Sequence, residues 1–411
     1  MKKIIALMLS SLMLFANNQI LSPIPPAKIF YINLEPEICD TACLEELLEK
    51  EYFISFLTRY EPKYANTGLE SAYALLSQDI VPTSRIATAG SDVKIAVLVP
   101  QKVIKSYSLI VTNALFSYSI RRSLNSNIKF FLTEDESSAN LNSAMISIKN
   151  EGFKFVIAPV TNTSLSVISD PKYSDLLFYI PTININSSPY KNSNLIYGGI
   201  DYNEQIQKLL ERSNHKIAAF YDGSRLGSML NSYVLQNSPD TYIREISGNK
   251  LNLKGMLDNN SRLKNASIFL NTPLIKTALL SSQFRVFDLN PNAVLSTQIN
   301  YNNALLSLTQ PLDRKNMYIA NSISQIDDEI TANNEIMGQN ITYDWVAYST
   351  TFGFDYLYTN FINQEATPLL SDKVENNQVI YDTKIMRANK FGFYIDENSS
   401  TSLESSLPTL P

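Results

Sequence analysis

Apolar runs and amphipathic stretches alternate along the middle of the chain, most clearly between Val93 and Val160. Three apolar runs, VKIAVLVP, NIKFFLTED and FKFVIAPV, are separated by SYSLIVTNALFSYSIRR and SANLNSAMISIKNEG, whose apolar residues have helical spacing. The runs are continuous rather than alternating, which is typical of parallel strands buried on both faces. The segment therefore predicts a strand–helix–strand–helix–strand unit of a parallel sheet with right-handed crossovers.

The same alternation continues through the rest of the chain. Further apolar runs include LFYIPTIN, KIAAFYD, ASIFLNT and NMYIANS, and amphipathic stretches such as YNEQIQKLLER lie between them. Helical spacing also predicts a long helix from Ala332 to Asn363, interrupted near Gln339–Thr342, and FGFYID predicts a last extended segment. The whole pattern predicts an α/β protein whose parallel sheets carry helices on both faces.

Residues 39–80 show helical spacing without apolar runs. Two stretches carry the apolar side chains, at Leu44, Leu47, Leu48, Phe53 and Leu57, and at Leu69, Ala72, Tyr73 and Leu76. Two helices alone bury little surface. We therefore expect this small helical module to dock on the main body or on a partner.

Cys39 and Cys43 are the only cysteines and lie at the start of this module. One helical turn separates their Cα atoms by about 6 Å, which is within disulfide range. An exported compartment permits a disulfide, and two free thiols on one helix face are the alternative. Redox catalysis is not expected, because the motif lacks the C-x-x-C spacing of redox sites.

The first residues have the pattern of a secretory signal peptide. Lys2 and Lys3 precede the apolar run Ile4–Phe15, which is short for a membrane span. We expect a signal peptide over 1–18, cleaved near Ala16 or Asn18, and an uncleaved anchor is the alternative. Because no cysteine comes directly after the run and no later apolar run reaches about 18 residues, we expect a periplasmic protein without a lipid anchor or integral membrane segment.

The composition excludes several classes of function. The 411 residues are 45% hydrophobic and 18% charged, as in ordinary globular domains, and the net charge of -5 argues against nucleic acid. The single histidine, His215, lies between an amphipathic stretch and an apolar run, where a loop or capping role is expected, and no plausible thiolate site is present. Ser-His-Asp and Cys-His catalysis are therefore not expected, and zinc lacks ligands. The acidic run Glu134–Glu136 fits a solvated loop after a strand. We therefore expect no enzyme activity, no cofactor and no metal.

The order of these elements resembles the type I periplasmic binding proteins, the family of the branched-chain amino-acid receptors, over residues 92–397. KIAVLVP is similar to the first strand of that family, GFKFVIAPVTNTS to the third and IPTININSS to the fourth. GGIDYNEQI resembles the crossover into the second lobe, AAFYDGSRLG the first strand of that lobe and FGFYIDENS the terminal strand. A helical module before such a body also resembles the outer-membrane activators of penicillin-binding proteins, although fold does not fix function.

The resemblance implies a two-lobed periplasmic-binding-protein-like body after the helical module. Its first lobe would comprise residues 92–200 plus 322–372, and its second lobe residues 201–321 plus 373–397. The tail, 398–411, is rich in Ser, Thr and Pro and is expected to be disordered.

In that family the ligand lies between the lobes, at the carboxyl ends of the strands. Hydroxyls and backbone N–H groups at the helix start Thr161–Ser164 would bind an anion, although helix capping alone also explains these residues. For the remaining residues, loop, turn or packing roles are the alternative. The expected ligand-binding residues are Thr161, Asn162, Thr163, Ser164, Asn184, Asn186, Ser187, Asp201, Tyr221 and Asp222.

Three places depart from the amino-acid receptors. Lys102–Ile104 follows the first strand where those receptors have Ser and Gly, which allow close backbone approach. Gly198–Ile200 stands where an Arg is usual, and Asn271-Thr272 replaces the acidic residue that binds an α-amino group. We therefore expect a non-enzymatic envelope scaffold or activator that binds a protein partner. The alternative is a solute-binding receptor that captures a small polar or anionic ligand for an ABC transporter or sensor.

One modification motif lies near the carboxyl end. Asp396-Glu397-Asn398-Ser399-Ser400 matches the bacterial N-glycosylation pattern of an acid, any residue, Asn, any residue and Ser or Thr. The motif predicts glycosylation of Asn398, and a chance match is the alternative.

Overall fold

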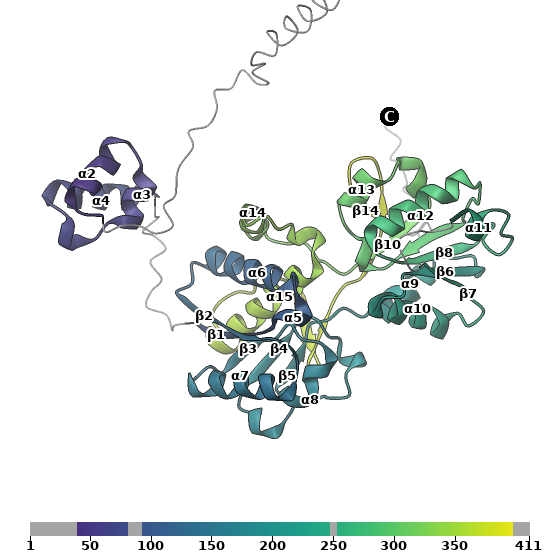
Figure 1. Ribbon diagram of the computed structural model, residues 1–411, viewed down its shortest axis with the longest axis horizontal. Helices are drawn as coiled ribbons and strands as arrows, with labels where there is room; N and C mark the ends of the chain where they lie inside the picture. Colours follow the sequence, from purple (N-terminus) through teal and green to yellow (C-terminus); the bar gives the residue numbers. More distant parts are fainter. Residues whose placement is uncertain (1–38, 81–92, 247–252, 398–411) are drawn as a thin grey trace, which may run out of the picture. The chain divides into compact units, whose positions relative to one another are not determined.

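The computed structural model describes residues 39–80, 93–246 and 253–397 of the chain (Figure 1). The chain divides into two compact units, Met1–Ile86 and Ala87–Pro411. The predicted signal peptide, the tail 398–411 and Asn398 lie outside the described residues.

Within its described residues, 39–80, the first unit contains three α-helices. The predicted first helical stretch is broken at Glu51, whose φ of 60° is left-handed, so that it forms two helices instead of one. Asp40 caps the first of them by accepting a hydrogen bond from the backbone N–H of Cys43 at 3.1 Å. Cys39 and Cys43 form a disulfide with a Cα separation of 5.2 Å. The helices are α2 (Thr41–Glu49), α3 (Phe53–Arg59) and α4 (Thr67–Ile80).

Aromatic and aliphatic side chains form the small core of this unit. Leu44, Phe56 and Leu69 are buried, and the rings of Tyr60 and Tyr73 stack with centroids 4.0 Å apart. Each helix contributes to this core, which explains why the apolar spacing was visible in the sequence.

The second unit contains two seven-stranded sheets, which confirms the predicted two-lobed α/β fold. The first sheet has the order β11-β12-β5-β4-β3-β1-β2, and its pairs are parallel except for β11 with β12. Its strands are β1 (Val93–Pro100), β2 (Ser126–Thr133), β3 (Phe155–Ile157), β4 (Leu177–Ile180), β5 (Leu195–Tyr197), β11 (Lys373–Glu375) and β12 (Gln378–Ile380).

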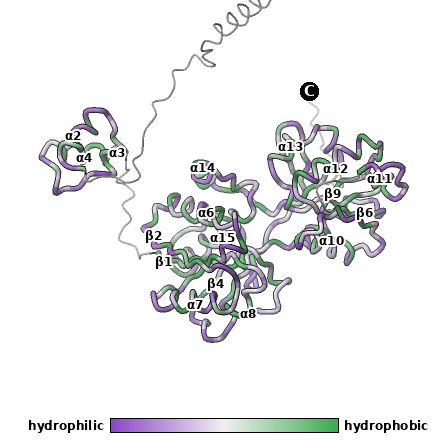
Figure 2. Tube along the Cα trace, in the orientation of Figure 1, coloured by the Kyte–Doolittle hydropathy of each residue, from purple (hydrophilic) through white to green (hydrophobic). Residues whose placement is uncertain are grey.

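The second sheet has the order β14-β13-β10-β9-β8-β6-β7, with β13 antiparallel to both of its neighbours. Its strands are β6 (Ile217–Tyr221), β7 (Tyr242–Glu245), β8 (Ser267–Asn271), β9 (Ala293–Ser296), β10 (Met317–Asn321), β13 (Lys384–Ala388) and β14 (Phe393–Ile395). The hydrophobic segments drawn in Figure 2 include much of these central strands.

Helices accompany both sheets (Figure 1). Those of the first lobe are α5 (Gln101–Ile104), α6 (Tyr107–Arg122), α7 (Ser138–Asn150), α8 (Leu165–Ile168), α14 (Asp328–Ile336) and α15 (Trp345–Leu357). Those of the second lobe are α9 (Tyr202–Leu210), α10 (Arg225–Asn237), α11 (Leu253–Leu257), α12 (Leu274–Val286) and α13 (Ala304–Leu308).

Strand β1 contributes side chains to two hydrophobic cores, one on each face of the sheet. Ile95 and Val97 pack into the cluster that contains α6 and α15, whereas Ala96 and Leu98 pack into the cluster that contains α7 and α8. Because successive side chains of a strand point to opposite faces, both faces of the sheet are buried. This is why the strand was a continuous apolar run in the sequence.

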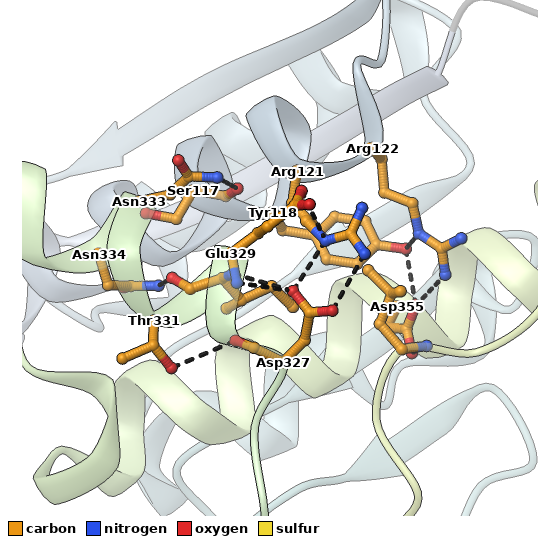
Figure 3. Close-up of polar contacts among 12 residues, drawn as sticks. Ser117, Tyr118, Arg121, Arg122, Asp327, Glu329, Thr331, Asn333, Asn334 and Asp355 are labelled. Carbon is orange, nitrogen blue, oxygen red and sulfur yellow. Dashed lines mark hydrogen bonds and ion pairs between the residues drawn. The ribbon is translucent and has the colours of Figure 1, made fainter.

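A partly buried polar network holds α14 and α15 against α6 (Figure 3). Arg121 donates to Asp327, at the N-cap of α14, with an N–O distance of 2.8 Å. The Asp355 carboxylate of α15 accepts hydrogen bonds from the Tyr118 hydroxyl at 2.7 Å and from Arg122 at 2.9 Å. The predicted long helix consists of two helices, α14 and α15, and these hydrogen bonds attach both of them to the first lobe.

The assignment of residues 373–397 to the second lobe differs from the structure. Within the described residues, β11 and β12 belong to the first sheet, where Gln378 is in register with Tyr197, and only β13 and β14 join the second. The hairpin turns at Asn376 and Asn377, which both have positive φ. Because these short, polar strands contain no apolar run, the sequence pattern did not predict which sheet they join.

Candidate functional site

The predicted anion-binding helix start is filled by a carboxylate of the chain itself. Thr161 follows the carboxyl end of β3 and caps the short helical turn Asn162–Ser164. Its backbone N–H donates to Oε1 of Glu136 at 2.6 Å, and its hydroxyl donates to Oε2 of the same carboxylate. Glu136 is only 8% exposed. The expectation that Glu134–Glu136 is a solvated loop is therefore wrong for Glu136, which fills the position predicted for a ligand.

The other predicted residues of the first lobe are brought together, mainly by hydrogen bonds to one another. Asn186 Nδ2 donates to the Asp201 carboxylate at 3.0 Å, and the Ser187 hydroxyl donates to the Asn184 carbonyl at 2.8 Å. Asn162 Nδ2 reaches the Ser187 carbonyl at 3.4 Å. The Asn184 and Asp201 side chains also cap the helical turns that follow them. The capping and turn roles considered as alternatives are thus present.

Thr163 and Ser164 complete the turn. The backbone N–H of Thr163 donates to Oγ1 of Thr161 at 3.3 Å, which is a capping interaction. Ser164 is fully buried, and its hydroxyl has no hydrogen-bond partner among the described residues.

Tyr221 and Asp222 lie at the carboxyl end of β6 in the second lobe. The Tyr221 hydroxyl donates to Glu245 at 2.9 Å, whereas Asp222 accepts from the backbone N–H and the hydroxyl of Ser224. A Cβ at Gly227 would lie 2.3 Å from Oδ1 of Asp222, so glycine is required for this carboxylate position.

A cavity of about 330 Å³ is lined by residues of both lobes. Of the ten predicted ligand-binding residues, only Asp222 lines it. The first lobe contributes Tyr107 and the start of α15, including Asp344 and Trp345. The second lobe contributes the carboxyl ends of β6 and β8 and the segment Gln298–Asn302.

Two carboxylates and five aromatic rings line this cavity, and no Lys or Arg is among its lining residues. Asp344 caps α15 through the backbone N–H of Ala347 at 3.0 Å. Burial raises the pKa of the Asp344 carboxyl above its usual range. Burial likewise raises the pKa of Tyr301 to about 12. A carboxylate beside aromatic faces suits a cation or a neutral polar group better than an anion.

Asn271 is the least satisfied polar residue of this cavity. It ends β8 and is 1% exposed, yet neither its amide nitrogen nor its amide oxygen has a hydrogen-bond partner among the described residues. A buried polar group without a partner costs about 1–3 kcal/mol. Asn271 therefore has an unused hydrogen-bond donor and an unused acceptor at the wall of the cavity.

Sequence reasoning missed Tyr107, Asp344 and Trp345. The first lies about 240 positions before the other two, and no local motif connects them. The available signal was that Trp345 is the only tryptophan and follows an Asp at a predicted helix interruption.

No helix in the described ranges is long and apolar enough to cross a membrane. The same ranges contain no group of three or more His, Cys, Asp or Glu side chains that could hold a metal ion.

The architecture is that of the type I periplasmic binding proteins. Structure comparison matches LivJ, the branched-chain amino acid transporter substrate binding protein from Streptococcus pneumoniae in complex with isoleucine, with a TM-score of 0.53 and 9% identity over 74% of this chain and 99% of LivJ. Full-length LpoA from Haemophilus influenzae matches with a TM-score of 0.52 and 13% identity over 86% of this chain and 68% of LpoA. LpoA is described as a regulator of PBP1A.

These similar proteins are binding or regulatory proteins, and their low sequence identities establish the fold alone. No family model matches the sequence, and no curated protein matches it in sequence.

Proposed function

We propose that the protein is an exported, non-enzymatic scaffold or activator of the periplasm, which binds a protein partner of the cell envelope through its two-lobed body. The observation that carries this proposal is the outer face of α6. Leu109, Phe116 and Ile120 lie on this face and are 63%, 43% and 55% exposed.

This stripe lies opposite the side of α6 that packs into the core. The residues buried on the inner side include Val111, Ala114 and Tyr118, half a helical turn away from the exposed stripe. An ordinary surface helix carries polar residues at the outer positions. The Phe116 ring also contacts Phe130 of the edge strand β2, with centroids 6.5 Å apart, which extends the apolar surface. Contiguous exposed apolar patches mark protein interaction sites.

Two further observations support a protein partner. Glu136 occupies the helix start that would otherwise be free for the carboxylate of a small ligand. The match to LpoA covers 86% of the chain, compared with 74% for LivJ. Because LpoA is described as a regulator of PBP1A, we propose a peptidoglycan synthase as the partner.

The test uses the purified protein and a purified bifunctional penicillin-binding protein from the same organism, with binding measured by biolayer interferometry. Replacing Leu109, Phe116 and Ile120 by Ser should weaken binding by at least about tenfold, since each loses an apolar contact of about 1 kcal/mol. The matched control replaces Ile275 and Leu312, which are exposed apolar residues of the second lobe, by Ser. No binding by the natural protein, or equal losses in both variants, would reject the proposal.

A second candidate function is favoured by Asn271. Its unpartnered amide in the interlobe cavity fits a solute-binding receptor, in which the lobes close on a small polar ligand. The carboxylates of Asp222 and Asp344 favour a ligand with an ammonium group over the anionic ligand expected from the helix start. Because Trp345 lines the cavity and is the only tryptophan, its fluorescence should report binding directly.

This second function is tested by titrating amino acids, polyamines and sugars while Trp345 emission and thermal stability are recorded. A ligand at 100 times its Kd should stabilise the folded state by about 2.7 kcal/mol. The change Asn271→Ala should weaken that binding, whereas Asn333→Ala, on α14 outside the cavity, should not. A panel without any fluorescence or stability response would leave the scaffold as the better explanation.

A further inference from the structure

The second lobe has a groove at the amino ends of β6 and β7. Its volume is about 870 Å³. It is lined by residues 214–217 before and within β6, by residues 240–244 of the edge strand β7 and its preceding turn, and by Arg262. Asp222 and Asn271 lie at the carboxyl ends of β6 and β8 and line the interlobe cavity. The groove is therefore at the opposite end of the same strands, away from the interlobe cavity.

Basic side chains dominate this groove in a protein of net charge -5. His215, Lys216, Arg244 and Arg262 line it together with a single acidic residue, Asp240. Within the described part of the chain, no ion pair joins any of the four basic residues to a carboxylate. Most of the other arginines in the described ranges have a carboxylate or carbonyl partner, so this cluster has unneutralised positive charge.

Tyr242 holds two of these charges close together. The guanidinium carbons of Arg244 and Arg262 each lie 5.1 Å from the centroid of its ring, and Arg244 Nε also donates to its hydroxyl. Each guanidinium gains a cation–π contact, but the two like charges repel each other. An anion bound between them would remove this repulsion.

Lys216 fixes the loop that carries Arg262. Its Nζ donates to the carbonyl oxygens of Ser261 at 2.9 Å and Lys264 at 2.7 Å. The backbone on both sides of Arg262 is thereby tied to the start of β6. Arg262 is therefore carried by a loop that is tied to β6, and Arg244 by the edge strand β7. The two arginines are held in place by this backbone and are not independent surface side chains.

We propose that this groove binds an extended polyanion that carries phosphate groups. Guanidinium forks match the oxygens of a phosphate in geometry and charge, and two of them share one aromatic platform here. The groove is much larger than one phosphate ion, so its ligand carries several anionic groups in a row. This inference is independent of the protein partner and of the interlobe ligand proposed above.

The experiment measures the binding of long-chain inorganic polyphosphate to the full-length protein by isothermal titration calorimetry, at low and at physiological salt. The natural protein should bind, and binding should weaken as salt rises, because exposed charges are screened. The double change Arg244→Gln and Arg262→Gln should weaken binding roughly tenfold, since each exposed ionic contact contributes up to about 1 kcal/mol. Both arginines are exposed, so the variant should keep the thermal stability of the natural protein.

Arg387→Gln is the matched control. Arg387 also stacks on a tyrosine of the second lobe, Tyr318 at 5.2 Å, but it does not line the groove, so its loss should leave polyphosphate binding unchanged. Poly-glutamate, a polyanion with carboxylates only, should bind more weakly than polyphosphate. The proposal is overturned if the natural protein binds no polyphosphate at low salt, if both variants lose the same affinity, or if poly-glutamate binds equally well.

Discussion

Removing the Glu136 side chain should open the helix start that it occupies. In Glu136→Ala, the backbone N–H and the hydroxyl of Thr161 both lose a carboxylate acceptor. Hydrogen bonds to charged groups contribute about 1.5–3 kcal/mol each, and water reaches part of the half-buried Thr161, so we expect a loss of about 2–4 kcal/mol in unfolding free energy. In a unit of this size, about 2 °C is lost per kcal/mol, which gives a fall in Tm of roughly 4–8 °C.

The assay is thermal unfolding followed by circular dichroism, with and without acetate. Glu134→Ala is the matched control, because Glu134 lies two positions away, is exposed, and pairs only with the exposed Lys102. An exposed ion pair contributes less than about 1 kcal/mol, so the control should unfold close to the natural protein. Acetate should raise the Tm of Glu136→Ala and leave that of the control unchanged, because only the former has a free anion position.

Either of two results would refute this reasoning. If Glu136→Ala and Glu134→Ala unfold at the same temperature, the buried hydrogen bonds of Glu136 do not stabilise the fold. If acetate stabilises the natural protein as much as Glu136→Ala, the helix start is not filled by Glu136.

Three further predictions concern stability. Asp355→Ala should lower unfolding free energy by about 3–5 kcal/mol in urea titrations, because it breaks a buried ion pair, whereas Asp175→Ala at an exposed pair should cost less than about 1 kcal/mol. Burial raises the pKa of Asp344 in the folded state, so the contribution of Asp344 to stability falls as pH rises from the unfolded pKa of about 4 through the folded pKa. The variant Asp344→Asn should therefore be more stable than the natural protein at pH 7. This gain in stability should vanish below about pH 4. Reducing the disulfide between Cys39 and Cys43 should destabilise the helical unit by about 2 kcal/mol, which is the loss expected from loop entropy for so short a loop. Hydrogen exchange of the α2 amides measures this effect, and unchanged exchange after reduction would contradict the prediction.

The sequence predicted features that depend on local order along the chain. The run VKIAVLVP is β1 itself, because a strand buried on both faces is apolar at every position. The disulfide was also predictable, since one helical turn joins its two cysteines. The residues around Thr161 were predicted to lie at one edge of the sheet, and their hydrogen bonds do bring them together.

The features that were not predicted depend on contacts between distant segments. Glu136 is 25 positions from Thr161, and an acidic triplet after a strand has the composition of a solvated loop. Trp345 and Asp344 reach the cavity only because α15 packs on α6, which follows from tertiary packing rather than from any motif. The hairpin of β11 and β12 has too few apolar residues for its sheet to be recognised.

The order in which the strands enter the two sheets has a consequence for how the chain folds as it emerges. Along the chain, β1 to β5 belong to the first sheet and β6 to β10 to the second. The next strands, β11 and β12, belong to the first sheet again, and β13 and β14 belong to the second. The first sheet therefore stays incomplete until residue 380 has emerged, and α6 has no α15 to cover it until residue 357 has emerged. Such long-range pairing slows folding and leaves apolar surface exposed while the chain emerges. A chaperone that binds unfolded chains should accordingly raise the folding yield of this protein more than that of a protein whose lobes are each continuous in sequence.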